Sequence, residues 1–138
     1  MPINRKGLQD LAKLRLKEAS LLLRSNHPDG AYYLAGYAIE CALKACIARQ
    51  TQRYDFPEKK TVLDSHTHDL KDLLVPAGIK PNHQAAMAQP EFAKKWKIVT
   101  EWKAESRYVR HSMQEARNLL SAITDRKAGV LGWIKQYW

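Results

Sequence analysis

The chain has 138 residues, of which 45% are hydrophobic and 27% are charged, and it contains six glycines and six prolines. These values exclude a disordered or fibrous chain and suit a single domain spanning residues 1–138. The formal net charge of +9 favours polyanionic partners such as RNA, DNA, nucleotides or an acidic protein, although many small basic proteins have no such partner.

Cysteine usage and the distribution of apolar residues predict a cytoplasmic protein that does not bind membranes. Cys41 and Cys46 fall in one expected helix, where their Cα atoms would lie roughly 8 Å apart, beyond disulfide reach. Small buried thiols are typical of a reducing cytosol. No stretch approaches the roughly 18 apolar residues of a membrane span, and residues 1–10 contain no apolar signal region.

The first expected helix is amphipathic and covers residues 5–25. Lysines and arginines lie opposite an apolar face that repeats at helical spacing. That face consists of Leu8, Leu11, Ala12, Leu16, Ala19, Leu22 and Leu23. Residues 25–30 read SNHPDG, which is a strong turn signal and ends the helix.

The second expected helix, residues 31–49, is apolar on almost all sides, which predicts the central buried helix of the domain. Glu40 and Lys44 interrupt its apolar surface, and because they are four positions apart they can form an ion pair. Gly36 costs about 1 kcal/mol of helix propensity, so we expect a neighbouring helix to pack closely against it. A polar loop is predicted over residues 50–60.

The middle of the chain predicts a short helix followed by a connector. Ser65 or Thr67 can cap this helix, with Asp69 in its first turn, and a proline and a glycine end it a few residues later. Residues 79–89 form a weak pattern and are expected to be a polar connector without regular structure.

Two further long helices are predicted in the last third of the chain. The first begins at Pro90, and residues 107–111 follow it as a helix end or bend. Ser112 and Glu115 form a capping-box pattern that opens the last helix, which runs to the C-terminus with a bend allowed near Gly129. The apolar stripe of the first of these helices contains Phe92, Trp96, Val99 and Trp102. A bundle is the natural way to bury four apolar stripes.

Two other groups of side chains have both a functional and a structural interpretation. His66, His68 and Asp69 could ligate a metal, but this pattern is common, so helix capping is preferred and no metal or other cofactor is expected. The tryptophans could stack nucleobases. Helical spacing instead favours a core position for Trp96 and Trp102. Trp133 and Trp138, near the end of the chain, could form a dimer patch.

Three segments resemble the HEPN (higher eukaryotes and prokaryotes nucleotide-binding) domain family. Residues 33–45, YLAGYAIECALKA, resemble the second helix of that family. Residues 66–70, HTHDL, resemble the start of its short helix, and residues 102–108, WKAESRY, resemble the lead into its last helix. The resemblance covers nearly the whole chain, and the second-helix string is its most specific part.

The resemblance implies an up-and-down four-helix bundle with one short extra helix, often as a homodimer. It also implies an activity, because many members are metal-independent ribonucleases of toxin–antitoxin or other defence systems. Others partner a nucleotidyltransferase or bind nucleotides. Active members carry an arginine followed, after four to six residues, by a histidine at a dimer cleft. The nearest pair here is Arg107 and His111, with three residues between them.

An Arg–His pair suits RNA cleavage because RNA carries its own nucleophile, the 2′-hydroxyl. A histidine can move protons near neutral pH, and an arginine can hold two phosphate oxygens. Arg107 and His111 are therefore the candidate catalytic residues, and they would face the same way if the segment between them were helical. The candidate substrate-binding residues are Arg110, Lys103, Glu40 and Lys44. Glu40 either orients Arg107 or His111, or forms a structural pair with Lys44.

These patterns predict a HEPN-like domain that binds RNA or a nucleotide at a basic cleft. If the domain is an enzyme, the expected activity is metal-independent RNA cleavage. The alternatives are phosphate binding without chemistry, a non-catalytic module that partners a nucleotidyltransferase or an antitoxin, and a structural helical dimer. The resemblance also implies a homodimer, although the sequence alone leaves the oligomeric state open.

Overall fold

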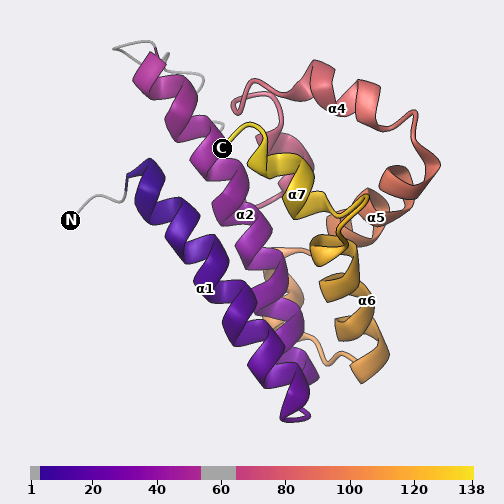
Figure 1. Cartoon of the computed structure of the whole chain (residues 1–138). Helices are drawn as coiled ribbons and strands as arrows, with labels where there is room; N and C mark the ends of the chain where they lie inside the picture. Colours follow the sequence, from indigo (N-terminus) through magenta and orange to yellow (C-terminus); the bar gives the residue numbers. More distant parts are fainter. Residues whose placement is uncertain (1–3, 54–64) are drawn as a thin grey trace.

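The computed structural model describes residues 4–53 and 65–138, and the regular elements within those ranges are all helical (Figure 1). In chain order they are α1 (Arg5–Arg24), α2 (Pro28–Arg53), η1 (Leu70–Leu73), α4 (Lys80–Ala86), α5 (Pro90–Thr100), η2 (Ala104–Tyr108), α6 (Met113–Thr124) and α7 (Val130–Lys135), where η marks a short 3-10 helix. The predicted all-α class is confirmed for the described part of the chain.

Helices α1 and α2 form an antiparallel hairpin along one side of the molecule (Figure 1). Asn4 caps α1 by accepting a hydrogen bond from the backbone N–H of Gly7 at 2.8 Å. The turn is shorter than predicted, because Pro28 is the first residue of α2 rather than part of the turn. The ring of proline fixes φ near its helical value, and Asp29 in the first turn complements the helix dipole. Asn26, with φ at 64°, reverses the chain.

Helix α2 is the centre of the fold, as its apolar sequence predicts. It contacts α1, α6, α7, η1 and η2, and most of its side chains between positions 31 and 47 are buried. The α2 side chains with no measurable exposure are Ala31, Ala35, Ala38, Ile39, Ala42, Leu43 and Ala45. Because α2 carries the buried apolar surface, the residues that interrupt it are the ones that need a structural or functional explanation.

Gly36 lets the ring of Trp102 lie directly on α2. A Cβ atom at Gly36 would be 2.2 Å from atoms of that ring. Trp102 is 1% exposed, and its Nε1 donates a hydrogen bond to the carbonyl of Tyr33 at 3.2 Å. The predicted close packing at Gly36 is confirmed, but its neighbour is a side chain that follows α5 and not another helix. Trp96 is also buried, so both tryptophans lie in the core as predicted.

The connector predicted over residues 79–89 is wrong, because it contains the helix α4. A proline lies in the first turn of α4, where its missing N–H costs nothing. His83 of α4 is 7% exposed and packs against the rings of Phe92, Trp96 and Trp133, with the Trp96 ring centroid 4.5 Å away. This aromatic packing holds a segment in place that is too polar to show a helical pattern.

The last predicted helix is divided into α6 and α7. The Asp125 backbone and side chain accept hydrogen bonds from the N–H groups of Gly129 and Ala128 at 3.0 and 2.8 Å, which closes a turn between the two helices. A Cβ atom at Gly129 would be 2.2 Å from the Asp125 carbonyl oxygen. The bend allowed near Gly129 is therefore a complete break, and α7 packs back on α2 and α6.

Three smaller predictions have different outcomes. Cys41 and Cys46 are free and buried, as expected, and burial raises the pKa of the thiols to about 11 and about 12. Residues 50–53 of the predicted loop belong to α2, and the rest of that loop lies outside the described residues. Within the described ranges, we find no helix with the length and hydropathy needed to cross a membrane.

Candidate functional site

The candidate catalytic residues lie at the junction between η2 and α6. Arg107 belongs to η2, whereas Val109 has extended backbone dihedrals and the N-cap of α6 is Ser112. The segment between Arg107 and His111 is therefore not one helix, and the two side chains do not share a helical face. Ser112 and Glu115 form the predicted capping box, with bonds of 3.1 and 3.2 Å.

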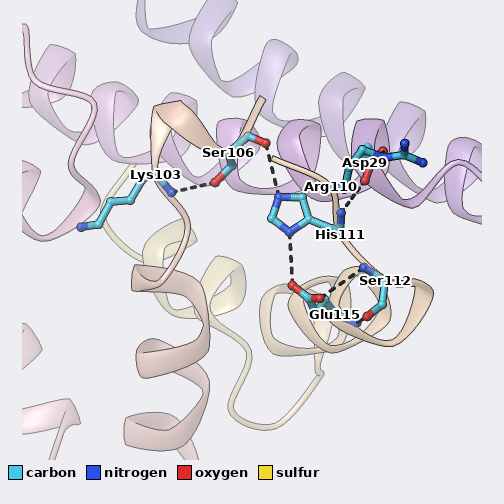
Figure 2. A network of polar contacts seen from close by, with 7 residues as sticks. All are labelled: Asp29, Lys103, Ser106, Arg110, His111, Ser112 and Glu115. Atoms are coloured by element: carbon cyan, nitrogen blue, oxygen red, sulfur yellow. Dashed lines mark hydrogen bonds and ion pairs between the residues drawn. The ribbon is translucent and has the colours of Figure 1, made fainter. Parts of the chain in front are cut away.

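Both ring nitrogens and the backbone N–H of His111 contact other groups of the protein (Figure 2). Its side chain is 8% exposed and stacks on the ring of Tyr32, with the ring centroids 3.8 Å apart. Its Nδ1 lies 3.2 Å from the Glu115 carboxylate, and its Nε2 lies 3.3 Å from the Ser106 carbonyl oxygen. Its backbone N–H donates to Asp29 at 2.5 Å. One residue thus connects α2, η2 and α6.

Both ring nitrogens of His111 face groups that only accept hydrogen bonds. The two bonds can form together only when each nitrogen carries a proton. The hydrogen bond from His111, followed by the one from the Ser112 backbone, lowers the pKa of Glu115, which keeps that carboxylate ionised. As long as these contacts persist, neither nitrogen of His111 is available to move a proton to or from a bound molecule.

The four residues before His111 are turned toward solvent. Tyr108 is 77% exposed, Val109 is 55% exposed, and the side chain of Arg110 is 94% exposed. Arg110 forms an ion pair with Asp29 at 2.5 Å. The Arg107 guanidinium lies 4.9 Å from the centroid of the Tyr108 ring, and within the described ranges no carboxylate pairs with it. We call residues 107–110 the exposed segment.

Asp29 was not among the predicted site residues, although it fixes this junction. The backbone N–H of His111, and then the ion pair with Arg110, lower the pKa of Asp29. The sequence signal was ambiguous, because an acidic residue in the first turn of a helix is explained by the helix dipole alone. Its partners are more than 80 positions away along the chain.

Glu40 belongs to a second cluster of polar side chains. Its side chain is 4% exposed, and its two oxygens lie 3.2 Å from the Lys44 ammonium and 3.0 Å from Nδ1 of His68. The predicted pair with Lys44 is therefore present. Its other partner is His68, and neither Arg107 nor His111 is bonded to it. Glu40 is eight residues from Tyr32 on α2, which separates the two clusters by roughly 12 Å along the helix axis.

Lys103 also belongs to this second cluster. Its ammonium group lies 3.1 Å from the Asp69 carboxylate, and Figure 2 shows its side chain pointing away from His111. A depression of about 370 Å³ lies here, and its lining comes from the segment before η1 and the start of η2. The lining residues are His66, Thr67, His68, Asp69, Lys103, Ala104 and Glu105. The six predicted site residues are thus divided between two neighbouring places.

The helix-capping interpretation of residues 65–69 is only partly confirmed. Thr67 accepts a hydrogen bond from the backbone N–H of Asp69 at 3.1 Å, but Asp69 itself is the N-cap of η1 and makes no side-chain capping bond. His68 reaches across to α2 instead. Within the described ranges, no group of three or more potential ligands is arranged to hold a metal ion.

Comparison with known proteins gives a family but no individual relative. A family model described as the HEPN domain matches residues 8–125. Neither the search of curated proteins nor the search of solved structures found a match.

Proposed function

The chain belongs to the HEPN domain family, and on that premise we propose that it binds RNA through the exposed segment, residues 107–110. Family membership supports a nucleotide- or RNA-related role in general. The composition of the exposed segment supports RNA in particular, because it combines two cations with an exposed aromatic ring.

The observation that carries this proposal is the exposure of Tyr108 beside Arg107. A tyrosine that is 77% exposed contributes little to the core, yet its ring lies against an arginine that has no carboxylate partner within the described ranges. Aromatic rings stack on unpaired bases, and arginine binds the adjacent phosphate. The net charge of +9 adds a long-range attraction for the same ligand.

Catalysis by Arg107 and His111 is less well supported than binding. His111 would have to release either Glu115 or Ser106 before a ring nitrogen could take part in proton transfer. We therefore assign His111 to the support of the exposed segment, because its contacts fix the backbone on which Arg110 and Tyr108 are displayed.

A protein partner is the second candidate function, and the exposure of Val109 favours it. Val109 adds exposed apolar area between a tyrosine and an arginine, two residue types that are enriched at protein interfaces. The basic charge suits an acidic antitoxin or nucleotidyltransferase. A second copy of the chain, as in a homodimer, could also cover Val109, and the molecular mass in solution measures that case.

Replacing Tyr108 with alanine is expected to weaken binding to a single-stranded RNA oligonucleotide by about 1–3 kcal/mol, because one stacked base is lost.

Replacing Arg107 with alanine is expected to lower the slope of log K against log salt by about 1, because one phosphate contact is lost. Fluorescence anisotropy over a series of salt concentrations measures both effects.

Arg126→Ala is the matched control for the loss of one arginine. Arg126 is exposed and lies beyond the far end of α6 from His111, roughly 18 Å away along the helix. We expect this variant to keep the affinity and salt slope of the unchanged chain. Equal losses in the Arg107 and Arg126 variants would mean that binding follows total charge and that the exposed segment is not the site.

A further inference from the structure

The Glu40–His68 pair has the geometry that His111 lacks. We propose that His68, oriented by the buried carboxylate of Glu40, takes the proton from a ribose 2′-hydroxyl and so cleaves RNA held by the exposed segment. This inference rests on the proposed function for the RNA itself. The assignment of His68 as the catalytic residue requires no proton transfer by His111, and Arg107 serves only to hold the RNA.

Glu40 fixes which nitrogen of His68 can act as a base. The carboxylate lies 3.0 Å from Nδ1, and a carboxylate accepts a hydrogen bond only from a protonated nitrogen. The lone pair of the ring is then on Nε2, which has no hydrogen-bond partner within the described ranges. The His68 side chain is 58% exposed, whereas Glu40 is 4% exposed. A buried carboxylate that orients an accessible imidazole is the arrangement used to prepare a histidine for proton transfer.

The groups around His68 fit a ribose–phosphate substrate. The Lys103 ammonium lies at the same depression and can neutralise the charge that develops on phosphate. The charged and titratable groups that surround His68 are Glu40, Lys44, His66, Asp69, Lys103 and Glu105.

RNA held by the exposed segment passes close to this depression. Glu105 lines the depression, and Arg107 is two residues further along η2, so their Cα atoms are at most about 7 Å apart. A strand bound at Arg107 can therefore extend along η2 to the depression that contains His68. The two clusters of polar side chains then have different tasks, since one binds the strand and the other acts on it.

The chemical step is an internal transfer within the RNA. The 2′-hydroxyl gives its proton to Nε2 of His68, the 2′ oxygen forms a bond to phosphorus, and the bond from phosphorus to the 5′ oxygen breaks. Water protonates the departing 5′ oxygen, and the hydroxide produced takes the proton back from His68. The products are a 2′,3′-cyclic phosphate and a 5′-hydroxyl end.

The test uses the full chain, a labelled RNA oligonucleotide and the DNA of the same sequence, in buffer containing a chelator. We expect the RNA to be cleaved and the DNA to remain intact, because DNA lacks the nucleophile. His68→Ala should slow cleavage by about 100-fold or more, which is the usual contribution of a general base. The matched control is His27→Ala, a histidine that is also exposed but lies in the turn before α2, and it should cleave at the unchanged rate.

Glu40→Gln separates a positioning role from a merely structural one. An amide at position 40 can donate as well as accept a hydrogen bond, so it no longer fixes the proton on Nδ1 of His68, and kcat should fall while KM stays unchanged. A lower melting temperature with kcat unchanged would show a purely structural role and would overturn the role given to Glu40.

A non-cleavable 2′-O-methyl RNA measures binding independently of cleavage. Retained binding with no cleavage by the unchanged chain overturns the inference and leaves the proposed function standing. Cleavage by His68→Ala at the unchanged rate also overturns it. Loss of all RNA binding would instead contradict the proposed function.

Discussion

Replacing Trp102 with alanine is expected to lower the free energy of unfolding by about 3–5 kcal/mol, which is the usual cost of removing a large aromatic side chain from a core. Trp102 is 1% exposed, its ring lies against Tyr33 with the centroids 5.9 Å apart, and its Nε1 donates to a backbone carbonyl of α2. The substitution leaves a cavity beside α2 and removes this hydrogen bond. Urea denaturation followed by circular dichroism measures the change.

Gly36→Ala provides the control through a double-mutant cycle. In the unchanged chain the added methyl group would be 2.2 Å from the Trp102 ring, so the substitution should destabilise the protein. In the Trp102→Ala background the space is free, and the same substitution should stabilise α2 by up to about 1 kcal/mol through helix propensity. Additive effects of the two substitutions would contradict the direct packing of Trp102 on Gly36.

His111→Ala is expected to cost about 2 kcal/mol of stability through the loss of one ring stack and two hydrogen bonds. The ring of His111 is the contact that joins α2, η2 and α6, so the loss should be greatest for the exposed segment. We therefore expect faster amide hydrogen exchange at residues 107–110 in this variant. His27→Ala, which removes an exposed histidine, should leave both quantities unchanged.

The pH dependence of this effect follows from the pKa of Glu115, which is lowered from its usual 4.5 by the hydrogen bond from His111. A carboxylate with a lowered pKa in the folded state contributes stability above the unfolded value of 4.5, and that contribution is lost as the pH falls through the folded pKa. The difference in stability between the unchanged chain and His111→Ala should therefore shrink below pH 4.5. A difference that stays constant from about pH 6 to about pH 3 would mean that Glu115 does not interact with His111 in solution.

The long helices could be predicted because their apolar residues repeat at helical spacing or, in α2, surround the helix. The elements that were missed depend on contacts between distant residues. Helix α4 is held by the packing of His83 among aromatic rings, and the break before α7 depends on bonds between Asp125 and Gly129. The residues of α4 give no apolar pattern at helical spacing, and Gly129 indicates only that a bend is possible, not that the helix ends there.

The candidate site could be predicted as a set of residues but not as an arrangement. The spacing of Arg107 and His111 places them on one face only if the segment is helical, and a bend was the alternative; the extended backbone at Val109 shows that the segment is not one helix. Glu40 was recognised as an exception in an apolar helix, yet its partner His68 is 28 positions away and lay in a segment already explained by helix capping. A buried carboxylate needs a partner, and that requirement was the one signal that pointed beyond Lys44.

The most direct test of RNA binding at the exposed segment is ultraviolet crosslinking of a uridine-containing RNA, followed by mass spectrometry of the crosslinked peptides. We predict a crosslink at Tyr108, whose ring is exposed beside Arg107. Crosslinks confined to Trp133, Tyr137 or Trp138 in the C-terminal part of the chain, with Tyr108 unmodified, would contradict it.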